Sequence, residues 1–446
     1  MFSRKGTQRI TFDLFAGCGG LSTGLEFAGF NPILVSELND DARESFVVNR
    51  STTLDGEKFS QLKDLHFGDI SELLRGIEGT FALLHELLRT QSKTVESLNL
   101  DLLCGGPPCQ GYSGIGHRRS YHVDRKDIPS NRLYEKMAEL IERSQPKLFL
   151  FENVKGILSG RWTEAGRKGE IWESVFGRFN SIKGYTVKYS LVQAKNYGVP
   201  QNRPRVLLVG IRNDVAARSG VDWLSSSVDA INCGFLPAPS EERPYPDIAD
   251  LLSDLVDESV ANQLVSQEFS PNFSTPRYLK NPTSLIQKWL RTCPDGSLLS
   301  KGDVLLEQEY SRHKSAVVSK FAAMHANEGK IPDELKTRKF AQRLLPAKWG
   351  EAGPTITATS LPDDYVHYLQ PRTLTVREWA RLQTFPDWYK FAGKRTTGGL
   401  RRAGNPREGN FEREVPKYTQ IGNAVPVKLA ECVGYHFNEI LNRAGY

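Results

Sequence analysis

The chain has 446 residues, which is long enough for roughly two or three domains with at least one large buried core. Hydrophobic residues make up 39% and charged residues 25% of it, as in an ordinary globular protein, and no apolar run approaches the roughly 18 residues that a membrane-spanning helix needs. Lys and Arg number 58 against 52 Asp and Glu, and the net charge of +6 favours a polyanionic partner only slightly.

The cysteines are expected to be reduced thiols. The sequence has no CxxC pair and no histidine at metal-ligand spacing beside a cysteine, so we expect no bound metal. The N-terminal segment carries no apolar export signal, and we therefore expect a cytoplasmic protein, in which disulfides are rare. At least one thiol is then available for chemistry. The six cysteines are Cys18, Cys104, Cys109, Cys233, Cys293 and Cys432.

The first part of the chain alternates short apolar runs with amphipathic segments. The runs ITFDLF, PILVSE, LDLLCGG and KLFLFEN each end close to a Gly, Asp or Glu, as strands do when a parallel sheet presents functional groups at its carboxyl edge. Between the last two runs, RLYEKMAELIERS has apolar residues at helical spacing and is predicted to end before Pro146. We predict an α/β fold with a doubly wound, mostly parallel sheet.

The later segments predict a sheet edge and a second domain. TVKYSLVQA and RVLLVGI lie on either side of the turn-rich segment KNYGVPQNRP, which predicts two antiparallel strands. Residues 213–371 become irregular, with Pro, Ser and Asn between short apolar clusters, and are assigned to a smaller domain. Helical spacing returns in LTVREWARLQTFP and after QIGNAVP. Residues 391–417 are rich in Gly and Arg, so we expect a mobile insertion.

A glycine-rich turn, DLFAGCGG at residues 13–20, follows the first predicted strand and precedes a helix. Its glycines would allow a ligand to approach the backbone at a helix N-terminus, although such a turn is as often a packing device. Glu37 ends the next strand, where a carboxylate can accept hydrogen bonds from both ribose hydroxyls of an adenosine; the alternative is a solvated acid. Asp69 would hold the adenine amino group and Ile70 would flank the ring.

Cys109, in GGPPCQGYSGIG, is the candidate nucleophile. Two prolines stiffen the backbone before it and glycines that can move follow it, which suits a reactive group on a rigid rim. A single cysteine is more often a small hydrophobic residue, so a second segment has to support this role. Glu152 provides that support, because it follows the apolar run LFLF and would stand at the exposed end of a buried strand.

Two arginines in QNRPR could complete this set. Arg203 and Arg205 lie two residues apart at the start of a strand and hence on one face. Arg205 could hold the O2 atom of a cytosine and Arg203 could brace the site, whereas the alternative is a pair of surface arginines.

These groups suit methylation of cytosine at C5, a carbon too weakly nucleophilic to react unaided. Addition of a thiolate at C6, with N3 protonated by an acid, turns the ring into an enamine whose C5 can attack a methyl sulfonium. Loss of the C5 proton then expels the thiolate, and a polarisable sulfur is suited to both addition and departure. The target base must first leave the helical stack.

The ordered motifs resemble those of the cytosine-5 DNA methyltransferase family. DLFAGCGG resembles the cofactor turn, GGPPCQGYS the nucleophile loop, FENV the acid strand and QNRPR the arginine segment, while RTLTVREWARLQTFP and QIGNAVP resemble the two C-terminal motifs. The resemblance spans nearly the whole chain. It implies the Rossmann-like fold of S-adenosylmethionine-dependent methyltransferases, with a target-recognition domain inserted in the catalytic domain.

The resemblance also assigns roles to individual residues. It implies that Cys109, Glu152, Arg203 and Arg205 form the catalytic set. It implies a cofactor pocket for S-adenosyl-L-methionine that comprises Phe15, Gly17, Gly19, Glu37, Asp69, Ile70, Pro107, Asn423 and Val425. One departure is Leu38, since the family usually places an aromatic residue after the ribose-binding glutamate.

The implied domains are residues 1–212 for the first part of the catalytic domain, 213–371 for target recognition and 372–446 for the C-terminal part of the catalytic domain. The last helix would return to pack beside the cofactor turn. Within the recognition domain, GPTITAT is similar to a Thr-rich loop that the family places near the flipped base.

We therefore predict a DNA (cytosine-5-)-methyltransferase that acts on one short word of double-stranded DNA. It is expected to be a monomer, to bind no membrane, and to be the modification enzyme of a restriction-modification system with a possible cognate endonuclease. Three alternatives stay open: a tRNA cytosine-5 methyltransferase, a catalytically silent DNA-binding relative, and a methyltransferase for small molecules. The residues after PPCQ, Gly111-Tyr112-Ser113, favour DNA. A silent binder would need none of the catalytic set, and a small-molecule enzyme would not need PPCQ with FENV.

Overall fold

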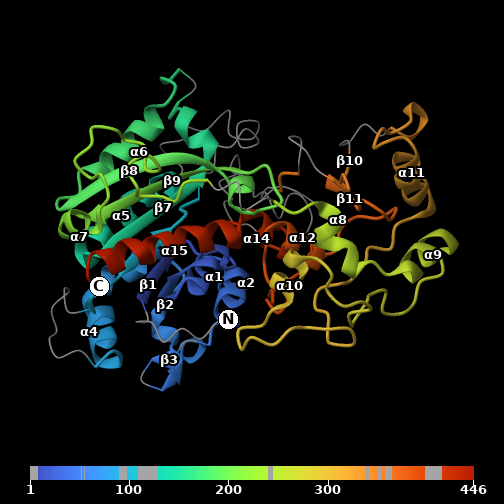
Figure 1. Ribbon diagram of the computed structural model, residues 1–446, viewed down its shortest axis with the longest axis horizontal. Helices are drawn as coiled ribbons and strands as arrows, with labels where there is room; N and C mark the ends of the chain where they lie inside the picture. Colours follow the sequence, from blue (N-terminus) through green and yellow to red (C-terminus); the bar gives the residue numbers. More distant parts are fainter. Residues whose placement is uncertain are drawn as a thin grey trace.

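A seven-stranded sheet forms the centre of the larger part of the molecule, with strand order β5-β2-β1-β6-β7-β9-β8 (Figure 1). The computed structural model describes residues 9–51, 53–54, 56–89, 98–108, 129–163, 165–239, 245–336, 342–348, 354–356, 364–396 and 414–446. The strands are β1 (Arg9–Leu14), β2 (Phe30–Ser36), β5 (His66–Phe67), β6 (Leu102–Gly105), β7 (Leu148–Val154), β8 (Tyr185–Gln193) and β9 (Pro204–Arg212). Two further short strands, β3 (Thr53–Leu54) and β4 (Glu57–Lys58), form a separate hairpin.

The sheet is parallel from β5 to β7 and antiparallel at β9 and β8. The predicted α/β fold with a mostly parallel sheet is therefore confirmed, as is the antiparallel pair at one edge. The central strands β6 and β7 are almost wholly buried, because helices cover both faces of a parallel sheet. Their carboxyl ends meet at one edge of the sheet, which is where the predicted acidic and glycine-rich segments follow.

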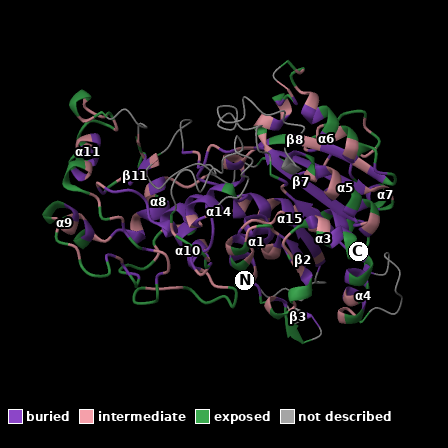
Figure 2. Cartoon of the chain, turned by 180° about the vertical axis from the view of Figure 1, so that it is seen from behind, coloured by how far each residue is buried: buried purple, intermediate pink, exposed green. Residues whose placement is uncertain are grey.

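Helices cover both faces of the sheet (Figures 1 and 2). One hydrophobic cluster joins one face to α2, α3, α4, α5 and α6, and a second cluster joins the other face to α1, α7 and α15. The predicted helix before Pro146 is α5, which ends at Ser144. The bounds are α1 (Gly20–Phe27), α2 (Asp40–Val47), α3 (Ile70–Arg75), α4 (Ile77–Leu87), α5 (Leu133–Ser144), α6 (Glu170–Asn180), α7 (Asn213–Ser219) and α15 (Val427–Arg443).

The smaller part of the molecule lies beside the sheet and contains short helices joined by long irregular segments (Figure 1). Its core combines residues of α8, α10 and α12 with Ile356, Tyr365 and Ile421. The elements are α8 (Ile248–Leu252), α9 (Glu258–Ser266), α10 (Leu285–Arg291), α11 (Ser315–Ala326), β10 (Arg343–Leu344), β11 (Tyr365–Val366), α12 (Val376–Leu382) and α14 (Lys417–Asn423). Within the described ranges, no helix has both the length and the apolar character needed to cross a bilayer.

The packing bears on the expected domain limits. Residues between Val215 and Leu236 belong to the same hydrophobic cluster as the sheet and α15, which favours a limit nearer residue 240 than residue 213. The core of the smaller part also takes in α12 and α14, which follow residue 371 in the chain. The division at residues 212 and 371 stays a prediction, and most of the 391–417 insertion lies outside the described residues.

Helix α1, which follows the glycine-rich turn, packs against α15 near the end of the chain. Gly20 and Gly24 face this joint, and a Cβ atom on either would overlap the backbone carbonyl of Val425 or Val427 respectively. Two glycines four residues apart lie on one side of a helix, so they form the surface that allows this close approach. The last helix therefore lies against the helix that the turn begins.

The first strand is tied to the same C-terminal helix. Nε of Arg9 donates a hydrogen bond of 2.7 Å to Oδ1 of Asn438, and Nη2 donates one of 2.7 Å to Oδ1 of Asn442. The same nitrogen donates to the carbonyl of Tyr446 at 3.0 Å. Strand β1 and the C-terminal helix are thus joined by partly buried polar contacts.

Candidate active site

The turn after β1 has an unusual backbone. Phe15, Gly17 and Gly19 have φ angles of 55°, 54° and 86°, in the left-handed region that favours glycine. A Cβ built on Gly17 meets no atom within 4 Å, so the space beside it is open for a ligand. A Cβ on Gly19 would instead overlap Arg50 and Tyr389. The missing side chain of Gly19 therefore makes room for protein atoms, which the sequence interpretation did not foresee.

The Glu37 carboxylate lies beside this turn. Its two oxygens accept hydrogen bonds of 2.9 Å from the backbone nitrogens of Gly17 and Asn39. Burial raises the pKa of Glu37, and these two hydrogen bonds partly oppose that shift. The neighbouring Leu38 side chain is 78% exposed, so the residue that replaces the family's usual aromatic side chain points into solvent.

Asp69 and Ile70 stand at the beginning of α3. Oδ1 of Asp69 caps this helix by accepting bonds of 2.7 Å from the backbone nitrogen and the hydroxyl of Ser71. Burial raises the pKa of Asp69, but the two Ser71 bonds together with the nearby Lys136 and Arg75 charges outweigh it and lower the pKa overall. Ile70 is only 2% exposed. The capping role of Asp69 was not predicted, and its contact with an adenine amino group stays a prediction.

Glu152 and Arg205 form a close ion pair at the end of β7. Nε of Arg205 lies 2.6 Å from Oε1 of Glu152, and both side chains are about 10% exposed, with values of 10% and 11%. A Cβ on Gly106 would stand 2.8 Å from Oε2 of Glu152, so only glycine leaves room for the carboxylate there. The two predicted catalytic residues are therefore in contact, at the sheet edge where β6 also ends.

Asn153 connects the acid strand to the segment that precedes the predicted nucleophile. Its Nδ2 donates a hydrogen bond of 3.1 Å to the carbonyl of Pro107. Pro107 is buried and Pro108 is exposed, so the chain turns toward solvent at this point. Cys109 follows directly but lies outside the described residues.

Arg203 does not contact the acid; it braces three other segments. Nη2 donates to the carbonyls of Gly422 and Ala424 at 2.9 and 3.0 Å, and Nη1 donates to the carbonyl of Ile356. Burial, with the adjacent Arg205 charge, holds the pKa of Arg203 well below its usual range. Arg203 thus joins the arginine segment to the Thr-rich segment and to the C-terminal QIGNAVP segment.

Two glutamines extend this bracing, and neither was predicted as a site residue. Oε1 of Gln201 accepts from the backbone nitrogen of Ile356 at 3.1 Å, and its Nε2 donates to Oε1 of Gln383 at 2.8 Å. Gln383 in turn donates to the carbonyls of Ile421 and Ala424 at 2.9 and 3.1 Å. A signal was present, because Gln201 stands in QNRPR beside the two predicted arginines and Gln383 stands in the C-terminal motif RTLTVREWARLQTFP.

The remaining predicted pocket residues lie near the joint between α1 and α15. Val425 is 8% exposed and its carbonyl faces Gly20, whereas Asn423 is exposed at the end of α14. The open backbone at Gly17, the adjacent Glu37 carboxylate and the buried Ile70 fit an adenosine-bearing cofactor, since they offer polar acceptors beside an apolar surface.

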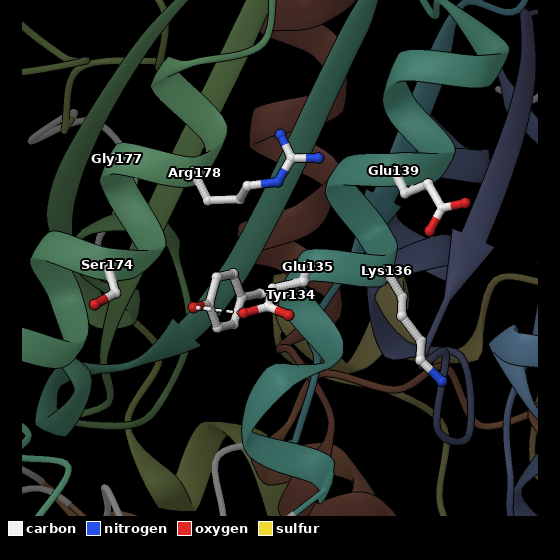
Figure 3. Close-up of a pocket in the computed structure, with 7 residues that line it drawn as sticks. All are labelled: Tyr134, Glu135, Lys136, Glu139, Ser174, Gly177 and Arg178. Carbon is white, nitrogen blue, oxygen red and sulfur yellow. Dashed lines mark hydrogen bonds between the residues drawn. The ribbon is translucent and has the colours of Figure 1, made fainter. Parts of the chain in front are cut away.

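A separate hollow of about 610 Å³ lies between α5 and α6 (Figure 3). It is lined by Tyr134, Glu135, Lys136, Glu139, Ser174, Gly177 and Arg178. None of the predicted site residues lines it, and its wall is mainly charged and polar. We assign it no part in the chemistry.

A mostly parallel sheet that ends in a glycine turn, acidic side chains and a proline-rich segment defines the class of S-adenosylmethionine-dependent methyltransferases. The family model for C-5 cytosine-specific DNA methylases matches residues 10–439. This chain belongs to that family and is a DNA (cytosine-5-)-methyltransferase.

Relatives of the restriction-modification type are similar along most of their length. The type II methyltransferase M.DdeI of Desulfomicrobium norvegicum is 28% identical over 447 residues, which cover 96% of this chain and 89% of the relative. M.XorII of Xanthomonas oryzae is 27% identical over 450 residues, or 98% of this chain and 86% of the relative. The family thus implies S-adenosylmethionine as methyl donor and DNA as substrate.

A solved structure shares the fold. It is described as a DNA modification methyltransferase encoded within a prophage of Escherichia coli, and it superposes with a TM-score of 0.64 at 21% identity. The match covers 97% of this chain and 99% of the other. The smaller part of the molecule is included in this coverage, which supports the predicted fold class.

Proposed function

We propose that this enzyme methylates C5 of a cytosine rotated out of double-stranded DNA, within one short recognition word, through a covalent bond between Cys109 and C6. The observation that carries the proposal is the Glu152–Arg205 ion pair, which stands beside the Pro107 segment that leads to Cys109. S-adenosylmethionine would supply the methyl group as an electrophilic sulfonium.

The chain's own residues would act in sequence on the base. The Cys109 sulfur adds to C6, while the Glu152 carboxyl holds N3 and gives it a proton, so that electron density moves to C5. Arg205, which contacts Glu152, would bind the O2 atom and hold the acid in place. After C5 is methylated, a water molecule or hydroxide would take up the C5 proton, elimination would restore the C5–C6 double bond and release the Cys109 thiolate, and N3 would return its proton to the Glu152 carboxylate.

The cofactor would be held at the turn after β1. The Gly17 backbone is open to a ligand and lies beside the Glu37 carboxylate, which we assign to the ribose hydroxyls. Phe15, Asp69, Ile70, Pro107, Asn423 and Val425 would form the rest of the pocket with Gly19. Residues 213–371 would read the DNA word. They include Thr355, whose hydroxyl donates a hydrogen bond to the carbonyl of Asn202 in the arginine segment.

We further propose that the enzyme is the modification partner of a restriction endonuclease with which it forms no stable complex, and that it acts as a monomer in the cytoplasm. Its type II relatives support the first part of this proposal. Methylation of tRNA is the second candidate, because the chemistry on the base is the same for both substrates.

The first test exposes the purified protein, with labelled S-adenosylmethionine, to mixed-sequence duplex DNA and separately to total tRNA. Deamination sequencing then maps the methylcytosines. We expect one recurring short word in DNA and no transfer by Cys109→Ala. Label in tRNA alone would replace the DNA proposal with the tRNA one.

A second test isolates the covalent step. Duplex DNA with 5-fluorocytosine at the mapped position has no C5 proton to lose, so the bond from sulfur to C6 should persist. Mass spectrometry of the digested product should find the nucleotide on the peptide with Cys109. An adduct on another residue, or none while methylation of normal DNA proceeds, would overturn the covalent mechanism.

A further inference from the structure

Two buried side chains from distant parts of the chain grip the turn after β1. The hydroxyl of Tyr389 donates a hydrogen bond of 2.5 Å to the carbonyl of Cys18. Nη2 of Arg50 donates one of 3.2 Å to the carbonyl of Gly19, and Nη1 donates one of 2.8 Å to the Tyr389 hydroxyl. We call Arg50 and Tyr389 the turn clamp. Gly19 lacks the Cβ that would overlap both of them, so the turn and the clamp fit only with glycine there.

The burial of Arg50 needs a physical reason, since a buried guanidinium loses its hydration. It is 4% exposed and lies over the Phe46 ring, with 3.6 Å between Cζ and the ring centroid. Nη2 also pairs with Glu26 at 3.2 Å. These contacts compensate the positive charge of the guanidinium. An apolar side chain, however, could fill the same space without any charge to compensate. What the guanidinium adds is a set of directed donors, two of which meet the turn and Tyr389.

Tyr389 is equally well fixed. Its hydroxyl is both a donor and an acceptor, and burial raises its pKa to about 12, so it keeps its proton at neutral pH. Nη2 of Arg377 donates to the Tyr389 carbonyl at 2.8 Å, and the next backbone nitrogen, of Lys390, donates to Oδ1 of Asn49 at 2.9 Å. The ring therefore has little freedom to follow the turn if the turn moves.

The turn needs such support, because the backbone of three of its residues is left-handed and one of them, Phe15, is not glycine. Glu37 holds the turn at the Gly17 nitrogen, and the clamp holds it at the next two carbonyls along the chain. A loop fixed on both sides does not lose conformational freedom again when a ligand binds.

We propose that Arg50 and Tyr389 are positioning residues that hold the turn in its cofactor-binding shape, so that they raise the affinity for S-adenosylmethionine without touching it. The inference rests on the proposed function, in which this turn binds the cofactor. It differs from a merely structural role, because the loss of one clamp hydroxyl should weaken cofactor binding more than the loss of an equivalent hydroxyl elsewhere.

The chain offers a matched control. The hydroxyl of Tyr185, at the start of the edge strand β8, also donates a buried hydrogen bond of 2.5 Å to a backbone carbonyl, that of Pro146. Tyr389→Phe and Tyr185→Phe thus delete the same group, with the same acceptor type and distance. Only Tyr389→Phe removes it from the turn. Arg50→Lys is a second clamp variant, which keeps a positive charge near Glu26 but loses the planar fork.

The test measures the dissociation constants of the full-length variants for S-adenosylmethionine and for S-adenosylhomocysteine by calorimetry. Tyr389→Phe should weaken both about five- to tenfold, as expected for the loss of the directed hydrogen bond to the turn and of the one accepted from Arg50, and Arg50→Lys should act in the same direction. Tyr185→Phe should change them less than about twofold. The rate at saturating cofactor and the affinity for DNA should stay within about twofold for all three variants.

Hydrogen exchange supplies a readout that does not need activity. The peptide that spans the turn should exchange faster in the two clamp variants and at the wild-type rate in Tyr185→Phe. Equal cofactor affinities in all variants would overturn the inference, as would failure of both clamp variants to fold, since the pair would then be a requirement of the fold itself. If the wild-type protein binds no cofactor, the proposed function fails instead.

Discussion

Glu152 and Arg205 lie diagonally across two antiparallel strands, and their side chains meet on the same face of the sheet. In the register of β7 and β9, Arg205 is opposite Val154, two residues beyond Glu152. Side chains alternate along a strand, so this register brings Nε of Arg205 to 2.6 Å from the carboxylate. The antiparallel reversal of β9 thus builds the proposed catalytic pair.

Removing the acid should therefore affect the chemical step. Glu152→Gln keeps the shape of the side chain but cannot give N3 a proton, and we expect single-turnover methylation to slow by at least about a hundredfold. The dissociation constant for S-adenosylmethionine should change less than about twofold. A variant that methylates at the wild-type rate would remove Glu152 from the mechanism. As a control, Arg178 lines the hollow between α5 and α6 (Figure 3), and Arg178→Ala, which breaks its ion pair with Glu142, should leave the rate unchanged.

Replacing a glycine by alanine should destabilise the protein at the joint between α1 and α15 but stabilise it in α6. In Gly24→Ala the new methyl group would overlap the carbonyl of Val427, and we expect unfolding to become easier by roughly 1–3 kcal/mol. Gly177 lies in α6 with no atom within 4 Å of a built Cβ (Figure 3). Gly177→Ala should stabilise the protein by about 0.5–1 kcal/mol. Urea unfolding measures both changes, and equal effects at the two positions would contradict the close approach.

The buried His367 should make the protein less stable in mild acid. Burial and the nearby Arg372 charge lower the pKa of His367 to about 3, and its Nδ1 accepts from the nitrogens of Leu369 and Gln370 at 3.1 Å. The unfolded chain takes up the proton near pH 6.5 but the folded chain does not, so stability is complete above pH 6.5 and falls as the pH decreases toward 3. At pH 5 we expect protonation of this one residue in the unfolded chain to lower the free energy of unfolding by about 2 kcal/mol.

The variant His367→Asn tests this origin. Asparagine keeps an acceptor for the two backbone nitrogens but does not titrate. Urea unfolding at pH 7.5 and at pH 5 should therefore show a smaller difference for the variant than for the wild type. An unchanged difference would assign the acid sensitivity to other groups.

A buried ionic network should make the smaller part of the molecule sensitive to the loss of a single charge. Arg381 of α12 pairs with Asp254 at 2.6 Å and with Asp387 at 2.5 Å, and Asp254 also pairs with Arg291 of α10 at 2.5 Å. Asp254→Asn leaves two guanidinium groups with less buried negative charge, and we expect a loss of about 3–5 kcal/mol in urea unfolding. A loss below about 1 kcal/mol would mean that water reaches the network.

The sequence was most informative where the pattern is local. The apolar runs and the prolines located β6, β7, α5 and the β8–β9 pair, because burial on both faces of a sheet and the geometry of proline act within a few residues. The order of the motifs also identified the family. The contact between Glu152 and Arg205 agrees with their assignment to one site, although their catalytic roles stay predictions.

What could not be predicted depends on contacts between distant segments. Arg50 has no local pattern that marks it as buried, and its partner Tyr389 lies 339 residues further along the chain. The packing of the segment from Val215 to Leu236 against the sheet is non-local in the same way. A partial signal existed at Gly20 and Gly24, since small residues four positions apart on a helix indicate that another backbone comes close.

The joint between α1 and α15 also brings together two segments that are synthesised far apart in time. A ribosome makes residues 24 and 427 roughly 20–80 seconds apart at about 5–20 residues per second, and until then α1 can pack against the sheet but not against α15. During this interval the nascent chain carries its glycine turn without the helix that supports it. If the turn binds the cofactor as proposed, that site is complete only after the segment around Val427 has been made, and a chain that lacks this segment should bind S-adenosylmethionine weakly.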